Sequence, residues 1–211
     1  HSFPTRRSSD LSKMAKRRFN RKLMQNRIMK KIILVPLLFA SLLVFAQEKM
    51  ITKSGIITFD ASFPSYDEVK GTNIGATVVL NPETGEIASL ALMKGFHFEI
   101  ALMEEHFNEN YMETDRYPKA IFRGQIEAFD RKTLTSNPKD FVMNGKLEIH
   151  GKAKDISVIA KISKVGPRVV LNTSFSVNTS DFSIPIPTLI QYKLASKVNI
   201  QLAAVLITDY K

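Results

Sequence analysis

The sequence predicts an all-β protein, folded as an antiparallel lipocalin-like β-barrel of about eight strands with one short helix at about residues 101–113. Three observations predict this fold class. Apolar and polar residues alternate with period two from residue 55 onward, several alternating segments are near ten residues long, and one segment alone has helical spacing. Long strands in hairpin order, each with one apolar face, favour a closed barrel.

The first strands are expected between residues 55 and 100. A turn at Asn81–Gly85 supplies Pro82 and Gly85 where a hairpin connection needs them. Alternation predicts strands on both sides of this turn, and it continues through a further segment in which Phe96, Phe98 and Ile100 share one face. The predicted strand segments are 57–63, 76–80, 87–93 and 96–100.

The alternation is interrupted at residues 101–113. Met103, Phe107 and Tyr111 recur at spacing four with acidic and amide residues between them, which predicts an amphipathic helix of about three turns. The helix should end before Tyr117, because Pro118 disfavours helical backbone at the residue that precedes it. Its apolar stripe fits either a lid over a tunnel mouth or a plug of the barrel core.

Strand patterns resume after the helix, at 120–128, 141–149, 156–162, 169–177 and 198–206. Gly124 and Gly145 fall on the inward face, where they either leave room in the lumen or let the strands bend. His150-Gly151 is expected to form a hairpin turn in which Gly151 has a positive φ. The apolar stretch 183–192 contains two prolines, so it is expected to form the other mouth of the barrel or a buried connection.

The first 46 residues differ from the rest. They hold eleven basic residues and one acidic residue, whereas residues 47–211 hold 19 of each sign. Residues 29–46 have a basic start, a 15-residue apolar run and a Val44-Phe45-Ala46 cleavage pattern, which predicts a secretory signal peptide rather than an uncleaved anchor. We expect residues 1–28 to be non-native read-through, with 1–11 adapter-like, rather than a genuine basic tail, and Met29 to be the true start.

The composition excludes several functions for residues 47–211. The balanced charge gives no basic surface for nucleic acid. The absence of Cys excludes disulfides and thiolate chemistry, and no serine has the surroundings of a catalytic elbow, so no enzyme is expected. His97, His106 and His150 lack metal-ligand spacing and are read as solvated or turn-stabilising; no metal is expected. A small outer-membrane barrel would share the alternation, but the helix and the charged terminus argue against it.

Two segments resemble a known family. HFNENYMETDRYPKAIFRG at 106–124 and MNGKLEIHGKAKDISV at 143–158 are similar to the helix–turn–strand and strand–turn–strand signatures of the YceI-like family of lipid- or polyisoprenoid-binding proteins. The second segment has Leu147, His150, Gly151 and Lys154 in the expected places. The resemblance covers about residues 50–208 and implies a periplasmic or secreted barrel that holds a long isoprenoid or similar amphiphile in an apolar tunnel.

We therefore expect residues 47–211 to store or transport an isoprenoid or lipid without catalysis, with no cofactor other than that ligand and no transmembrane span after signal cleavage. A structural envelope protein whose barrel is filled by its own side chains is the alternative, and homodimerisation stays open. The predicted ligand contacts are Phe98, Ile100, Met103, Phe107, Tyr111, Phe122, Ile126, Met143, Leu147, Phe175, Phe182 and Leu189.

Overall fold

The computed structural model describes Met14, Lys16, Met24 and residues 48–63, 68–188 and 194–209, with no side-chain description for residue 194. The chain divides into two units, residues 1–46 and 47–211. In the first unit the three described residues are helical and exposed. The predicted signal peptide and the predicted contact Leu189 lie outside the described residues. No described helix has the length and apolarity needed to cross a membrane.

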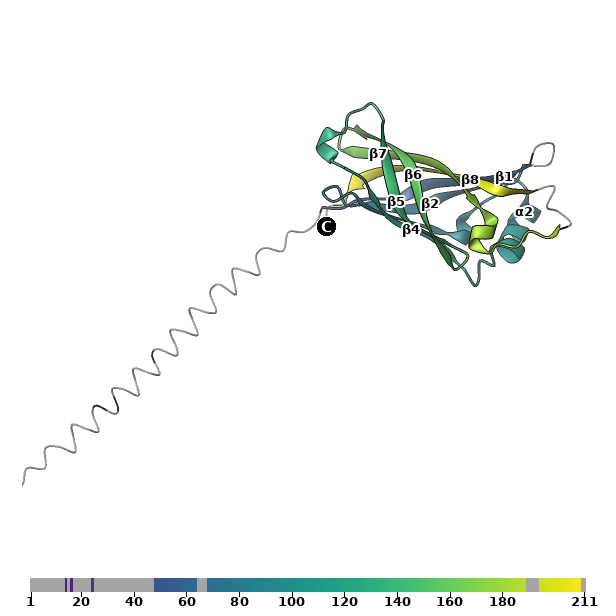
Figure 1. Cartoon of the computed structure of the whole chain (residues 1–211), viewed down its shortest axis with the longest axis horizontal. Coiled ribbons are helices and arrows are strands. Elements are labelled where there is room, and N and C mark those ends of the chain that lie inside the picture. The colour runs from purple at the N-terminus through teal and green to yellow at the C-terminus, as the bar shows by residue number, and fades with distance from the viewer. Residues whose placement is uncertain are drawn as a thin grey trace, which may run out of the picture. The chain divides into compact units, whose positions relative to one another are not determined.

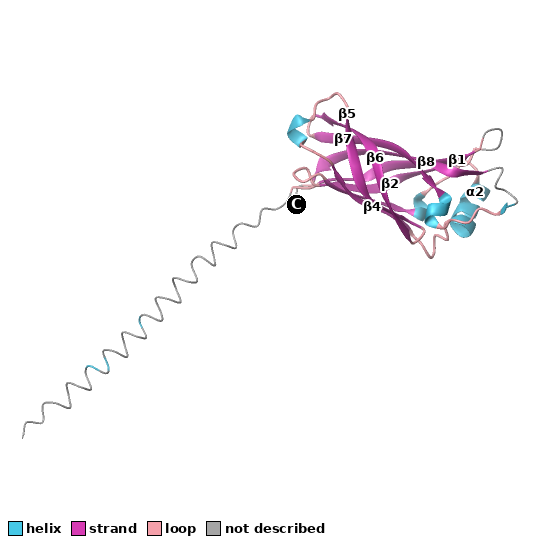
Figure 2. Cartoon of the chain, viewed as in Figure 1, coloured by secondary structure: helices cyan, strands magenta, loops and turns pink. Residues whose placement is uncertain are grey.

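Residues 47–211 contain a closed antiparallel barrel of eight strands, which confirms the predicted fold class (Figures 1 and 2). Each strand pairs with the next along the chain, and the last strand pairs with the first. The strands are β1 (Met50–Ser62), β2 (Lys70–Leu80), β3 (Glu86–Leu92), β4 (Lys119–Ile126), β5 (Lys139–Ile149), β6 (Lys152–Val165), β7 (Arg168–Asn178) and β8 (Leu194–Thr208).

The up-and-down order sorts the connections between the two ends of the barrel. The connections β1–β2, β3–β4, β5–β6 and β7–β8 lie at one end, which we call the open end, and the other three lie at the packed end. The open end carries η2 (Met93–Gly95), α2 (Ala101–His106), the π-helical η3 (Phe107–Tyr111) and η5 (Thr179–Phe182). Figure 1 shows α2 and, in yellow-green, η5 at this end.

The packed end is filled by side chains from nearly every strand. Aliphatic residues that face inward there lose all or nearly all solvent exposure, and each contributes about 1.5–3 kcal/mol of transfer free energy. These residues belong to one buried cluster, which closes this end of the lumen. Its fully buried members at this end are Met50, Val78, Leu80, Ile126, Ile162, Val169, Leu171 and Leu206.

Two predicted turns are confirmed. At Asn81–Gly85, the Asn81 side-chain oxygen accepts hydrogen bonds from the backbone N–H groups of Glu83 (3.0 Å) and Thr84 (3.3 Å), and Gly85 has φ +76°. Between β5 and β6, His150 and Gly151 both have positive φ, at 52° and 70°. Positive φ at both central residues is what a two-residue hairpin with the right strand twist requires.

The segment 96–100 is not a strand, so that prediction is wrong. η2 ends β3 and turns the chain, after which only His97 keeps a sheet contact, an isolated antiparallel bridge to Thr72. Phe96 and Phe98 still face the barrel interior, which explains why the sequence alternates there. The helix that follows is confirmed, with α2 and η3 together covering residues 101–111, and it ends two residues before the predicted boundary.

Candidate functional site

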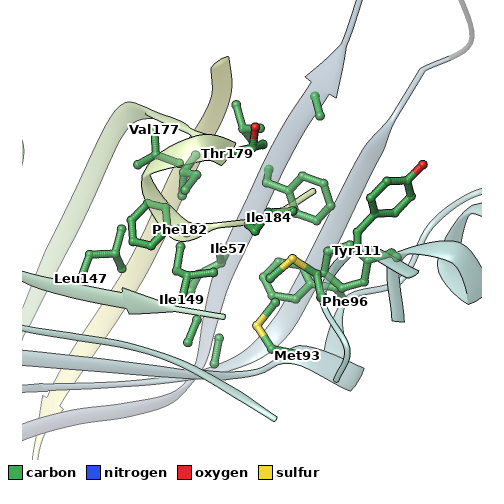
Figure 3. Close-up of a pocket in the computed structure, with 18 of the residues that line it drawn as sticks. Ile57, Met93, Phe96, Tyr111, Leu147, Ile149, Val177, Thr179, Phe182 and Ile184 are labelled. Carbon is green, nitrogen blue, oxygen red and sulfur yellow. The ribbon is translucent and has the colours of Figure 1, made fainter. Parts of the chain in front are cut away.

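An apolar cavity of about 710 Å³ occupies the open-end half of the barrel. Figure 3 shows Leu147 and Ile149 from β5, Val177 from β7 and Phe96 around it. The described lining contains no Asp, Glu, Lys or Arg, and its polar members are Ser89, His106, Tyr111, Thr173 and Thr179.

Most of the sequence-predicted contact residues come together at this cavity. Ile126 does not, because it is 1% exposed in the packed layer beneath. The predicted residues that line the cavity are Phe98, Ile100, Met103, Phe107, Tyr111, Phe122, Met143, Leu147, Phe175 and Phe182. Their lining position is a structural fact, whereas their contact with a ligand stays a prediction.

The cavity has a floor near the middle of the barrel. On seven of the strands, the inward-facing residues line the cavity from the open end down to one deepest residue. The inward-facing residues nearer the packed end do not line it. On β5, for example, Met143 lines it and Phe141 does not; on β7, Thr173 lines it and Leu171 does not. The floor residues are Ile57, Ser89, Phe122, Met143, Val158, Thr173 and Leu202. The lumen is therefore hollow at the open end and filled at the packed end.

Phe107 places the helical segment against the cavity wall. Its ring stacks on Phe59 at a centroid distance of 5.2 Å and lies 5.1 Å from the ring of Phe98 and 5.8 Å from that of Phe96. Phe107 is 9% exposed and belongs to a second buried cluster with Met112. The residue therefore combines the two interpretations of the helix, since it lines the cavity and is also part of a core.

The rim of the cavity exposes apolar side chains. Ile100 and Leu102 line the cavity at its helical side and are each about half exposed. Tyr111 lies on the same segment, and burial raises the pKa of its phenol above the ordinary value, so the hydroxyl stays neutral and able to donate a hydrogen bond. The entrance is thus apolar with an uncharged polar group beside it.

The segment after β7 lies at the same end as the helix, so the prediction that it forms the other mouth is wrong. Phe182, Ile184 and Ile186 line the same cavity as Phe107 and Tyr111. The β3–β4 and β7–β8 connections are separated by four strands. Each strand of an up-and-down barrel reverses the chain direction, so an even number of strands brings the chain back to the same end. The packed end needs no second mouth, since its lumen is filled.

His150 was expected to be solvated or turn-stabilising, and the structure contradicts only the first of these, because the residue is buried within the β5–β6 turn. It is 8% exposed, with Nδ1 3.3 Å from the carbonyl oxygen of Phe182 and Nε2 3.2 Å from a carboxyl oxygen of Glu113. The Tyr117 ring packs against it at 4.3 Å. One side chain in the β5–β6 turn thereby joins η5 to the segment that follows η3; we call this contact the His150 clamp.

Glu113 also contacts Arg116. The distance between its carboxyl oxygen and the Arg116 guanidinium is 3.5 Å, so the carboxyl group of the His150 clamp contacts a guanidinium as well as the imidazole.

A second tie holds η5 to the barrel wall. The Lys154 ammonium donates a hydrogen bond to Asp181 and lowers the pKa of that carboxyl below its usual range. His97 on the outer side pairs with Glu104 at 3.4 Å and is exposed. Within the described ranges no group of three or more His, Asp or Glu side chains is arranged to hold a metal ion.

Sequence reasoning missed several lining residues. Ile57 and Phe59 share the inward face of a strand that alternation had identified, so their pattern was visible although their depth was not. Ile184 lies in the apolar segment singled out for its composition. Alternation puts Ser89 and Thr173 on the inward faces of their strands, but neither was predicted as a lining residue, because a hydroxyl residue on a strand is most often at the surface.

Three comparisons with known proteins complete the description. The family model for the YceI-like domain matches residues 50–206, more than half of the chain. A polyisoprenoid-binding domain from Saccharophagus degradans, implicated in plant cell wall breakdown, is similar in structure at TM-score 0.66 and 12% identity, over 76% of this chain and 98% of that one. No curated protein sequence matches.

Further solved structures share the fold. Burkholderia cenocepacia BcnA aligns at TM-score 0.60 and 17% identity, covering 73% of this chain and 96% of that chain. The Campylobacter jejuni YCEI protein aligns at TM-score 0.56 and 17% identity, covering 71% of this chain and 90% of that chain. At these identities the likeness concerns the barrel fold.

Proposed function

The chain belongs to the YceI-like domain family, and on that basis we propose that its barrel binds the long apolar chain of an isoprenoid or similar amphiphile. The observation that carries the proposal is the cavity of about 710 Å³, a volume in the usual range for ligand pockets. Its described lining contains no Asp, Glu, Lys or Arg. A structurally similar barrel is described as a polyisoprenoid-binding domain.

The driving force is burial of apolar surface. Each CH₂ group transferred from water contributes about 0.8 kcal/mol before the entropic cost of association. The lining offers Phe, Ile, Leu, Met and Val side chains and no buried charge that the ligand would have to neutralise. Affinity should rise with chain length until the ligand fills the cavity between its mouth and the floor at Met143 and Leu202, and then stop rising.

Binding without chemistry accounts for this site. The polar side chains of the described lining are hydroxyls and one imidazole, and the described lining contains no carboxylate or amine. The function is then storage or transport of the ligand. The alternative, a barrel filled by its own side chains, applies to the packed end and not to the half that contains the cavity.

Thermal unfolding together with native mass spectrometry tests the proposal. A ligand at 100 times its dissociation constant stabilises the folded protein by about 2.7 kcal/mol, so a saturating isoprenoid alcohol should raise the melting temperature by several degrees. The complex should show one ligand per barrel. No shift with isoprenoid alcohols, fatty alcohols or alkanes, together with a ligand-free mass after expression, would reject the proposal.

We further propose that residues 29–46 direct the barrel to the periplasm or the medium and are removed after Ala46. The proposal rests on the basic start, apolar run and small-residue pattern of that segment. Expression of residues 29–211 in a bacterial host, followed by cell fractionation and intact mass measurement, tests it. A mature chain that begins at Gln47 in the periplasmic fraction is expected, and a full-length chain in the membrane fraction would contradict it.

A further inference from the structure

The polar groups of the cavity lie at its two ends. His106, Tyr111 and Thr179 come from the connections at the open end. The other two, Ser89 on β3 and Thr173 on β7, are both floor residues, each the deepest lining residue of its strand. Because β3 and β7 are four strands apart in either direction around the barrel, the two hydroxyls lie on opposite sides of the floor.

Ser89 is the unusual member of this pair. It is 9% exposed, lies between the buried inward residues Ile87 and Ala91, and lines the cavity. Within the part of the chain that the structure describes, its side chain makes no hydrogen bond, whereas the Thr173 hydroxyl donates to the carbonyl oxygen of Ile159 at 2.8 Å. This hydroxyl is reachable from the cavity, so a hydrocarbon that covers it would leave it without a partner, whereas a ligand oxygen at the floor would pair with it.

The chemistry of the partner follows from the surrounding wall. The Ser89 hydroxyl can donate to an oxygen or accept from a hydroxyl. Thr173 uses its proton on Ile159, so it offers only lone pairs to the cavity. No Lys or Arg side chain lines the described cavity, so an ionised carboxylate or phosphate at the floor would be buried without a counter-charge, which is strongly unfavourable.

We propose that the floor of the cavity, at Ser89, is a binding site for an uncharged oxygen of the ligand, a carbonyl or a hydroxyl, so that a polar group of the amphiphile enters first and lies deepest. This inference rests on the proposed function. It assigns Ser89 as a specificity-determining residue that favours oxygen-bearing chains over plain hydrocarbons of the same length.

Two probes of equal length test the site on the full chain. Hexadecane and methyl tetradecyl ketone have the same number of carbons and differ by one carbonyl, and both can be supplied from cyclodextrin. Affinity is measured by displacement of a fluorescent fatty probe and checked by native mass spectrometry. The wild type should prefer the ketone by about tenfold, the ratio expected from one buried hydrogen bond.

Substitutions then locate the carbonyl. Ser89→Ala should remove the preference for the ketone, because the floor then has no hydroxyl on β3, and Ser89→Thr should keep the preference. Ala91→Ser in the Ser89→Ala background moves the hydroxyl one inward position toward the mouth, to another buried lining residue, and should not restore it. Tyr111→Phe removes the hydroxyl at the mouth and should leave the ratio unchanged.

The outcomes separate this inference from the proposed function. If the wild type binds both probes equally, or if Ser89→Ala keeps the ketone preference, the floor site is wrong while binding of apolar chains stands. Loss of the preference in Tyr111→Phe would place the carbonyl at the mouth and would also overturn the inference. If neither probe binds the wild type, the proposed function itself is wrong.

Discussion

The ring of Phe122 covers Gly145 across the β4–β5 pair: a Cβ atom at Gly145 would lie 2.6 Å from Cζ of that ring. Gly145 is paired directly with Gly124, whose missing side chain is also covered by Phe122. The two glycines therefore do not enlarge the cavity, because the aromatic ring takes the space above them. Of the two sequence interpretations, room in the lumen is therefore wrong at this point of the wall.

Gly145→Ala should destabilise the barrel strongly. The new methyl group would collide with the carbonyl oxygen of Arg123 and with the Cα atom of Gly124, which are backbone atoms and cannot rotate away. Overpacking of this kind costs about 3 kcal/mol. Urea unfolding of the purified variant, followed by circular dichroism, measures the change in the free energy of unfolding.

Two controls accompany Gly145→Ala. Gly75→Ala on β2 meets no atom closer than 3.7 Å and should change stability by no more than about 0.5 kcal/mol. Adding Phe122→Ala to Gly145→Ala should not rescue it, because the backbone collision persists. A rescued double variant would show instead that the ring contact is the main source of the destabilisation.

His150 should stabilise the open end through its two clamp bonds, although its own backbone conformation is unfavourable. His150→Ala loses both bonds and keeps a residue with a Cβ atom at φ 52°, so the backbone cost of about 1–2 kcal/mol is the same as in the wild type. His150→Asn loses the bonds but relieves part of that cost, because asparagine tolerates this backbone conformation. We expect losses of about 2 kcal/mol for the alanine variant and about 1 kcal/mol for the asparagine variant. Equal losses would mean that turn strain plays no part.

The sequence predicted the barrel because its period-two signal is a direct record of which face is buried. The sequence was also sufficient to place the two apolar connections, the helix before β4 and the segment after η5. Counting the strands between them puts both at the same end of the barrel. That step was not taken, although four strands were predicted between the helix and residues 183–192 and an even number of strands returns the chain to the same end of the barrel.

Other features of the site depend on contacts between distant residues. The burial of His150 requires Glu113 and Phe182, which come from two other connections. Ile126 lies below the floor because of the packing of all eight strands. The local sequence pattern is the same for an inward-facing residue in the core and for one in the cavity wall. Local patterns give the face of a residue and not its level along the barrel axis.

Asp60 should make the barrel sensitive to acid. The hydroxyl of Ser62 and then its backbone N–H, at 2.9 Å, hydrogen-bond the Asp60 carboxylate and lower its pKa below the usual value. A carboxyl whose pKa is lower in the folded state stabilises the fold fully above its unfolded pKa of about 4, and this contribution is lost as the pH falls through the folded value.

Asp60→Asn is therefore expected to be less stable than the wild type at neutral pH, with a difference that shrinks as the pH is lowered. Urea unfolding between pH 7 and pH 2.5 measures it. Ser62→Ala keeps the backbone donor and removes the hydroxyl, so it should give an intermediate pH dependence. A difference between Asp60→Asn and wild type that stays constant with pH would contradict the assignment.

Phe107 provides the last test, because it belongs to both the cavity wall and a buried aromatic cluster. Phe107→Ala removes a ring stacked on Phe59 and should cost about 3 kcal/mol, the lower end for Phe→Ala, since one side of the ring faces the cavity. It also widens the entrance, so a bound isoprenoid alcohol should dissociate faster.

Leu102→Ala, at a residue 57% exposed on the rim, is the matched control and should change stability by less than about 1 kcal/mol. Phe107→Leu keeps an apolar side chain and should stay folded; if its ligand dissociates as slowly as from the wild type, Phe107 acts as core alone and the lid interpretation of the helix fails.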